Sequence, residues 1–237
     1  MNLGNRNELD GEDMKIKVDV ITLHAVQNYG SVLQALATQK LLERHGCEVR
    51  IINYIRENVK YENLLETRSN GNFLKKIILY PNIKRWKKVF EGFCNEYLNL
   101  TEKSYTTDQE FEEYPLEADI FCTGSDQVWN PILTDGPDLV YWGQYCSKQS
   151  EIIGYAISSG VKELFDSHCF LDVSKWLSCF NRIGVREKRL EEFVNKHGYE
   201  ATVVLDPILM ANPCILESIT PKRIVEYPYV LVYAVGK

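Results

Sequence analysis

One strand–helix–strand unit near the N-terminus constrains the fold more than any other feature of this chain. Lys17–Leu23 is an apolar run rich in β-branched residues, which is typical of a buried strand. Ser31 suits the N-cap of a helix that runs to about His45, and Gly46 is its natural end. Val49–Tyr54 resembles a second strand. A connection of this kind joins parallel strands, so the unit predicts a parallel sheet.

The same alternation continues along the chain. Further strands are predicted at residues 118–122, 152–157, 183–185, 202–205 and 229–235, and helices at 73–98, 165–180 and 186–197. The helical pattern of 73–98 contains Pro81, which predicts an interruption there. The polar segment 56–72 is interpreted as an excursion from the core. Alternating strands and helices predict an α/β fold with a Rossmann-like, doubly wound parallel sheet.

Three segments define the expected domain organisation. Residues 1–16 are polar and acidic, and they are interpreted as a flexible leader. Residues 17–220 hold the predicted N-terminal Rossmann-like domain. Residues 221–237 are interpreted as a linker and the first strand of a truncated second domain, because a buried strand needs partners for its backbone groups.

Composition excludes several classes of protein. The chain is 45% hydrophobic and 25% charged, as expected for a globular protein, and its net charge of −6 argues against a general nucleic-acid binder. No apolar run approaches the roughly 18 residues of a membrane span, and the N-terminus lacks the pattern of a secretory signal. A cytoplasmic protein is therefore expected.

The cysteines and histidines do not predict a metal site. The chain has 7 cysteines, an odd number, without a C-x-x-C pair, and its 4 histidines show no metal-binding spacing. Buried free thiols in a reducing compartment are the expected state of the cysteines. A catalytic thiol is the alternative.

Polar residues gather where the predicted strands end, which is where open α/β sheets bind ligands. The clearest case is Thr123–Pro131, which follows the apolar run of residues 118–122. The candidate site residues at these strand ends are His24, Asn28, Tyr29, Gly30, Ser31, Gly124, Ser125, Asp126, Gln127, Trp129, Ser158, Ser159, Arg186 and Glu187. The backbone amides at the start of the helix that follows residues 28–31 are suited to bind an anion. The plainer alternatives are an N-capped turn there, an ion pair of Arg186 with a nearby carboxylate, and a cap or turn at Asp206-Pro207.

Five stretches in order resemble the polysaccharide pyruvyl transferase family. They are residues 22–37 (TLHAVQNYGSVLQALA), 121–131 (FCTGSDQVWNP), 155–159 (YAISS), 183–188 (IGVREK) and 203–209 (VVLDPIL). The resemblance implies two Rossmann-like domains that face a cleft, similar to GT-B glycosyltransferases, with this chain as the N-terminal half. It implies transfer of a pyruvyl group from phosphoenolpyruvate to two hydroxyls of a sugar, in cell-surface or exopolysaccharide biosynthesis. An essential histidine and a further arginine are expected in the second domain, so this chain alone is expected to be weakly active or inactive.

The resemblance also implies roles for single residues. Phosphoenolpyruvate is an anion, so Arg186 is the expected ligand of the donor. Asp126 is the expected residue to orient or deprotonate a sugar hydroxyl. The remaining candidates are expected to line the substrate cleft. No cofactor and no metal are expected, since phosphoenolpyruvate is itself the donor substrate.

The expected partner is a sugar or a lipid-linked oligosaccharide, and no nucleic acid. The helix at residues 82–97 interleaves cations with aromatic and aliphatic residues. A solvated basic face is the plainer interpretation. The functional one is a basic surface that faces an anionic glycan, a lipid-linked substrate or the inner face of a membrane. Two other functions stay open at this point. One is a GT-B-like glycosyltransferase that uses a nucleotide sugar, and the other is a non-catalytic binding protein.

Overall fold

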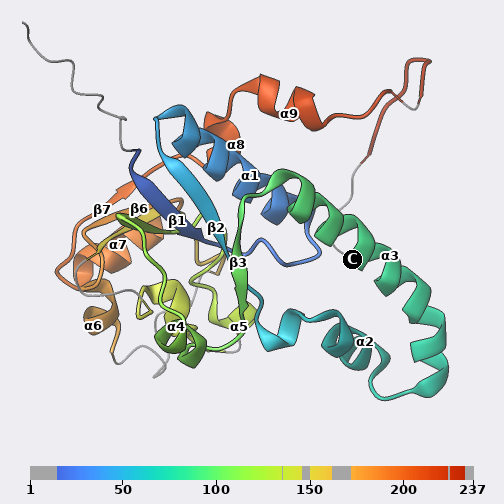
Figure 1. Ribbon diagram of the computed structural model, residues 1–237, viewed down its shortest axis with the longest axis horizontal. Coiled ribbons are helices and arrows are strands. Elements are labelled where there is room, and N and C mark those ends of the chain that lie inside the picture. The colour runs from blue at the N-terminus through green and yellow to red at the C-terminus, as the bar shows by residue number, and fades with distance from the viewer. Residues whose placement is uncertain (1–14, 135, 146–149, 162–171, 224, 233–237) are drawn as a thin grey trace, which may run out of the picture.

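The computed structural model describes residues 15–134, 136–145, 150–161, 172–223 and 225–232. Within this part, a parallel seven-stranded sheet carries helices on both faces (Figure 1). Its strands are β1 (Lys17–Ile21), β2 (Glu48–Tyr54), β3 (Leu100–Tyr105), β4 (Ile120–Thr123), β5 (Glu151–Ile157), β6 (Arg182–Val185) and β7 (Ala201–Val203). Their order is β3-β2-β1-β4-β5-β6-β7, and every neighbouring pair is parallel. The predicted α/β, Rossmann-like doubly wound sheet is confirmed.

Two hydrophobic cores lie on opposite faces of the sheet. On one face, α1 (Tyr29–Arg44), α3 (Phe73–Tyr97) and α9 (Pro213–Ile219) contribute apolar side chains to a core with β1 and β2. On the other face, the larger core is rich in aromatic rings from the elements between β3 and β7. The elements there are α4 (Gln109–Glu113), α5 (Pro131–Thr134), the 3₁₀ helix η2 (Leu139–Trp142), α6 (Val173–Leu177) and α7 (Lys188–Lys196). Burial on both faces explains why the central strands are nearly continuous apolar runs.

The strand order indicates at which edge of the sheet a ligand would bind. From β1 the chain moves outward to β2 and β3, returns to β4 beside β1, and continues outward in the opposite direction. The direction reverses between β1 and β4, and open α/β sheets bind ligands at such a switch point, beyond the carboxyl ends of the strands. The loops that follow β1, β4, β5 and β6 therefore meet at one edge.

Three helices near this edge differ from the sequence predictions. The cap of α1 is Asn28 rather than Ser31, because the Asn28 side chain accepts hydrogen bonds from the amides of Gly30 and Ser31. α3 runs through Pro81 without the predicted interruption. Pro81 is exposed, so water can bond the carbonyl that the proline leaves without an amide. Part of the predicted excursion 56–72 is helical, as the 3₁₀ helix η1 (Glu57–Val59) and α2 (Tyr61–Ser69).

The last part of the chain also differs from expectation. The described part of the predicted strand 229–235 is exposed and forms no strand, and residues 233–235 lie outside the described part. After β7, α8 (Pro207–Met210) and α9 follow instead. The predicted helix 165–180 is described only from residue 172, where α6 lies, and the predicted leader is described only at residues 15–16. The proposed boundary at residue 221 stays a prediction.

The cysteines that are described are free thiols of differing exposure. Cys94 and Cys122 are buried, and burial raises their pKa to about 11 and about 12, which disfavours a catalytic thiolate. Cys214 is exposed, so burial is not general. Cys146 and Cys169 lie outside the described residues. Among the helices of the described part, none is long and apolar enough to cross a bilayer.

Candidate functional site

The loop that follows β4 is held against β5 by backbone hydrogen bonds. The Ser158 amide donates to the Asp126 carbonyl at 2.9 Å, and the Trp129 amide donates to the Ser158 carbonyl at 3.2 Å. Gly124 begins the loop at φ +115°, and a Cβ at this position would lie 2.2 Å from the Tyr155 carbonyl oxygen. Only glycine fits so close to another backbone in this conformation. The glycine therefore lets the loop run close beside β5 and carry its polar residues to the sheet edge.

Asp126 is the centre of a polar cluster at that edge. Its Oδ2 accepts a 2.5 Å hydrogen bond from Ser31 Oγ, and Arg186 Nη2 lies 3.8 Å from its Oδ1. Its backbone φ is +88°, a left-handed conformation that costs a non-glycine residue about 1–3 kcal/mol. The structure thus brings together both predicted catalytic residues, from the loops after β4 and β6, with the first turn of α1.

Arg186 is shared between two carboxylates. Its Nη1 donates to Asp206 Oδ2, while its Nη2 faces Asp126. Asp206 also accepts from the Ile208 amide at 2.9 Å, which caps α8, and its Oδ2 lies 3.5 Å from Ser125 Oγ. One guanidinium between two carboxylates leaves the cluster with net negative charge. The ion pair considered for Arg186 is therefore present, and its charge is already compensated before any anion binds.

Asp206 was missing from the predicted site residues. The sequence placed it at a strand end, but the following proline favoured a cap or a turn. The structure gives it both roles, since it caps α8 and pairs with Arg186.

Buried polar side chains beneath the cluster hold these loops together. Thr22 Oγ1 donates to the Ser125 carbonyl at 2.6 Å. Gln34 Nε2 donates at 2.8 Å to both Thr22 Oγ1 and the Ser31 carbonyl. All of these residues are buried, where low dielectric strengthens hydrogen bonds. The network ties the end of β1 to α1 and to the loop after β4, so it fixes Ser31 relative to Asp126.

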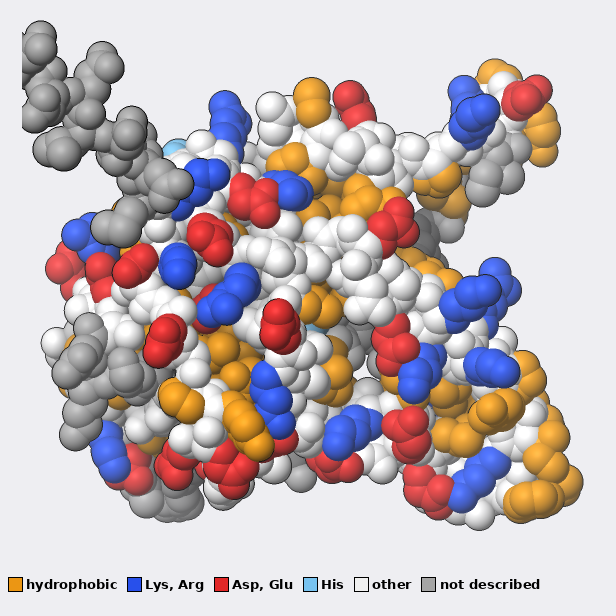
Figure 2. Space-filling view, in the orientation of Figure 1, with side chains coloured by type: hydrophobic (Ala, Val, Ile, Leu, Met, Phe, Trp, Pro, Cys, Tyr) orange, Lys and Arg blue, Asp and Glu red, His pale blue; other side chains and the backbone are white. Residues whose placement is uncertain are grey.

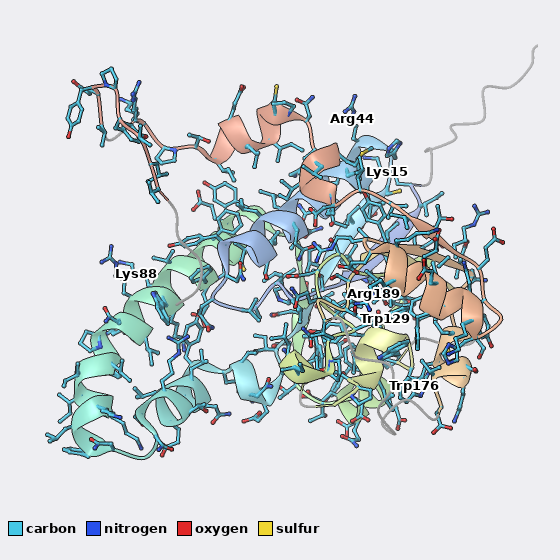
Figure 3. The ribbon with its side chains drawn as sticks, turned by 180° about the vertical axis from the view of Figure 1, so that it is seen from behind. Lys15, Arg44, Lys88, Trp129, Trp176 and Arg189 are labelled. Carbon is cyan, nitrogen blue, oxygen red and sulfur yellow. The ribbon has the colours of Figure 1, made fainter. Side chains whose placement is uncertain are left out.

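Trp129 lies in the core and not at the edge (Figure 3). It is 1% exposed, its ring stacks on Trp142 at a centroid distance of 4.0 Å, and its Nε1 donates to the Tyr141 carbonyl at 3.1 Å. The side chain is therefore part of the core, and its predicted contact with a substrate stays a prediction. Gln127 is also engaged, since its Oε1 accepts from Asn130 Nδ2 at 2.8 Å. These two residues anchor the loop that presents Asp126.

The predicted serines after β5 are buried and support a carboxylate. Ser158 and Ser159 are 1% and 4% exposed, and Ser158 Oγ donates to Glu187 Oε1. The other carboxylate oxygen of Glu187, Oε2, is buried without a hydrogen-bond partner among the described residues. An orphaned buried oxygen is rare in folded proteins. It marks Glu187 as a group that a substrate hydroxyl would satisfy.

The first turn of α1 is partly occupied by its own cap. The amides of Gly30 and Ser31 donate to Asn28 Oδ1 at 2.8 and 3.4 Å. An anion at these amides would have to displace the Asn28 side chain. Tyr29 is 63% exposed, and its ring packs against Phe90 of α3 at a centroid distance of 5.1 Å. This turn therefore contacts Asp126 through Ser31 and α3 through Tyr29.

A pocket of about 310 Å³ lies between the carboxyl ends of β1 to β3 and the helices α2 and α3. Its lining includes His24, Asn53, Tyr61, Phe90, Asn95 and Ser104. His24 is 2% exposed, with Nε2 3.4 Å from Asn53 Oδ1, and burial lowers its pKa so that the imidazole is neutral. His24 therefore belongs to the pocket, whereas Asp126 and Arg186 are not among the residues that line it. Nothing in the sequence pattern indicated this pocket, because α2 forms part of it.

The charges around the pocket are balanced. Lys60 Nζ lies 2.5 Å from Glu57 Oε2. Lys87 Nζ lies 3.8 Å from carboxylate oxygens of both Glu62 and Glu91. Amide, hydroxyl and aromatic groups make up much of the remaining lining. Such a surface suits an uncharged ligand with several hydroxyls better than an anion.

The described residues contain no group of three or more His, Cys, Asp or Glu side chains placed to hold a metal ion. The three comparisons with known proteins gave one match. The family model described as polysaccharide pyruvyl transferase matches residues 28–235. Neither the curated proteins nor the solved structures gave a significant match. The match includes Asp126, Arg186 and Asp206, and it extends over most of the chain. The chain therefore belongs to the polysaccharide pyruvyl transferase family and is a transferase.

Proposed function

We propose that the protein transfers a pyruvyl group from phosphoenolpyruvate to two hydroxyls of a sugar, forming a cyclic ketal in cell-surface or exopolysaccharide biosynthesis. The observation that carries the proposal is the family match over residues 28–235. The cluster of Ser31, Asp126 and Arg186 at the switch point of the sheet supports it.

The reaction needs proton transfers that carboxylates can perform. Protonation of the methylene carbon of phosphoenolpyruvate makes its central carbon electrophilic, and a first sugar hydroxyl adds there and loses its proton. Departure of the phosphate and attack by the second hydroxyl complete the ketal. One sugar diol and one phosphoenolpyruvate thus give one ketal and one phosphate. A base near the hydroxyls contributes about 10²–10⁴-fold to such a step.

Asp126 is the proposed base for a sugar hydroxyl. Its Oδ2 already accepts a hydrogen bond from the Ser31 hydroxyl. A substrate hydroxyl can donate to the same oxygen, either beside Ser31 or in its place. Arg186 holds Asp126 and Asp206 in place. We propose that Arg186 binds the donor anion only after one of these carboxylates has released the guanidinium and bound substrate instead. Because the cluster has net negative charge, it suits the sugar acceptor better than the anionic donor.

The acceptor sugar is proposed to bind in the pocket beside α2 and α3. A volume of about 310 Å³ is at the small end of ligand pockets, which suits one or two sugar rings. Tyr61 and Phe90 offer apolar faces, and Asn53, Asn95 and Ser104 offer polar groups for hydroxyls. The first turn of α1 connects this pocket to the proposed base, because Tyr29 packs on Phe90 of the pocket lining while Ser31 bonds Asp126.

The remaining elements of the function are also proposals. The acceptor is a free or lipid-linked oligosaccharide, and the reaction takes place in the cytoplasm, at the inner face of the membrane. A GT-B-like second domain supplies the histidine and the arginine that the family resemblance implies.

Acceptor-dependent release of phosphate tests the proposal. The full-length protein is incubated with phosphoenolpyruvate and a panel of methyl glycosides, and inorganic phosphate is measured. Release that needs both substrates supports the transfer. Release from a nucleotide sugar instead, or no release with any glycoside, would reject it.

A further inference from the structure

The hairpin of α2 and α3 extends away from the sheet (Figure 1). It ends in exposed apolar side chains. Five residues in the first turns of α3 are more than half exposed: Phe73 (72%), Leu74 (70%), Ile77 (56%), Ile78 (72%) and Tyr80 (54%). Orange and blue side chains gather over this end of the molecule in Figure 2. We call these five residues the hairpin tip. A contiguous apolar surface of this kind marks an interaction site.

The charged residues in the first part of α3 and the turn before it have one sign, although Glu66 of α2 pairs with Lys76. Every charged residue between Thr67 and Phe90 is a lysine or an arginine, although the whole chain has a net charge of −6. They are Arg68, Lys75, Lys76, Lys84, Arg85, Lys87 and Lys88. Within the described residues, no carboxylate lies within 4 Å of Lys75, Lys84, Arg85 or Lys88.

The apolar and basic residues share one side of α3. At 3.6 residues per turn, Phe73, Ile77, Lys84 and Lys88 form one row, and Leu74, Ile78 and Arg85 form the row beside it. The buried residues Ile83, Phe90 and Cys94 point to the opposite side. Lys88 lies on α3 well away from the sheet (Figure 3). The exposed side of α3 is therefore apolar at its start and basic further along.

This pattern fits a membrane surface with anionic lipids. Apolar side chains bury in the boundary between headgroups and acyl chains, while cations beside them pair with lipid phosphates. A second copy of the chain fits poorly, because a symmetric contact would bring the same cations against each other. We propose that the hairpin tip inserts into the headgroup region of an anionic membrane, with Lys84, Arg85 and Lys88 on the lipid surface.

The proposal does not depend on the reaction, but it would locate the reaction at the membrane surface. The pocket proposed for the acceptor lies at the base of the same hairpin, and both helices contribute to its lining. A hairpin docked at its tip would hold the pocket close to the surface that carries lipid-linked sugars.

Vesicle flotation tests the proposal. The full chain is mixed with vesicles of phosphatidylcholine alone, or with 3:7 phosphatidylglycerol:phosphatidylcholine, at low and at high salt. Binding is expected for the anionic vesicles and is expected to weaken with salt. The triple variant Lys84→Ser/Arg85→Ser/Lys88→Ser should weaken binding about a hundredfold, since each cation near such a surface contributes about fivefold. The variant Phe73→Ser/Ile77→Ser/Ile78→Ser should weaken it at least tenfold.

Matched variants elsewhere in the chain distinguish the effect of the hairpin from general effects of charge and hydrophobicity. Lys175→Ser/Arg189→Ser/Lys196→Ser removes exposed cations from α6 and α7, and Ile132→Ser/Leu209→Ser removes exposed apolar residues from α5 and α8. Both controls should bind like wild type. Circular dichroism and a melting curve confirm that each variant folds.

Three results would overturn the proposal. One is a wild-type chain that does not float with anionic vesicles. Another is equal binding by the hairpin variants and their controls. The third is a dimer in sedimentation that the tip variant converts to a monomer while vesicle binding is unchanged, which would make the tip an interface between copies.

Discussion

Ser31 Oγ donates a 2.5 Å hydrogen bond to Asp126 Oδ2, and this contact joins the first turn of α1 to the loop after β4. The two residues are far apart in the chain but meet at the switch point of the sheet, because β1 and β4 are neighbours. Arg186 approaches the same carboxylate from the loop after β6. The proposed function depends on this arrangement.

Asp126→Asn should lower the transfer rate at least a hundredfold, because an amide cannot accept the proton of a sugar hydroxyl. The fold should persist, since asparagine tolerates a positive φ as well as aspartate does. Steady-state kinetics and a melting curve measure the two effects. Asp172→Asn, at the exposed residue just before α6, is the matched control and should behave like wild type. Wild-type turnover by Asp126→Asn would remove this residue from the mechanism.

Arg186→Ala should abolish transfer and lower the free energy of unfolding by about 1–2 kcal/mol, because Asp126 and Asp206 then face each other without a cation. Adding Asp206→Asn should recover most of the lost stability. Asparagine caps a helix as well as aspartate does, and it removes one of the two charges. The double variant should stay inactive. Urea denaturation compares the three proteins, and an unchanged instability in the double variant would contradict the ion-pair account.

Gly124→Ala should destabilise the fold by about 3 kcal/mol or more, because the new Cβ would lie 2.2 Å from the Tyr155 carbonyl oxygen at a φ of +115°. Gly92→Ala is the matched control. It lies in α3 with open space around the new Cβ, so it should stabilise the fold by about 0.5–1 kcal/mol. Urea denaturation gives both values. A tolerated alanine at residue 124 would show that the loop does not pass as close to β5 as described.

The stability of the protein should depend on pH through His24. Burial lowers the pKa of His24 in the folded state, so below the ordinary value of about 6.5 the unfolded chain takes up a proton more readily than the folded one. The contribution of His24 is therefore full above about pH 6.5 and is lost as the pH falls through the lower folded value. His24→Gln should flatten the fall in unfolding free energy below pH 6.5. His45→Gln, at an exposed residue after α1, should leave the wild-type slope, and equal slopes in all three proteins would contradict the burial of His24.

Tyr61→Ala should raise KM for a soluble acceptor glycoside about tenfold while it leaves KM for phosphoenolpyruvate unchanged, because Tyr61 lines the pocket proposed for the sugar. Tyr227→Ala removes an equally large but exposed side chain and should change neither value. An effect on the donor instead of the acceptor would move the acceptor site out of this pocket.

The sequence predicted those parts of the fold whose signal is local. The β-branched runs of β1, β2 and β5 and the stop at Gly46 are such signals, and so is the cluster of polar residues after β4. β3 was missed because Leu100–Tyr105 is an edge strand with polar and charged side chains, which carries little apolar pattern. Asn28 was passed over as the cap because Ser31 is an equally suitable residue type and only the backbone decides between them.

The site was predicted in part for the same reason. Asp126 and Arg186 follow strands of one parallel sheet, so topology alone brings them to one edge. The burial of Trp129 depends on its stacking with Trp142, a contact between loops that no periodicity reports. The pocket depends on how α2 packs against α3, which is again a tertiary contact.

Mass spectrometry of the product tests the proposed function most directly. The full-length protein is incubated with phosphoenolpyruvate and the methyl glycoside that gives acceptor-dependent phosphate release. The proposed function predicts a product heavier than the glycoside by one pyruvic acid less one water, with one phosphate released for each product formed. A product that carries a transferred hexose from a nucleotide sugar, or an unmodified glycoside with phosphoenolpyruvate intact, would contradict it.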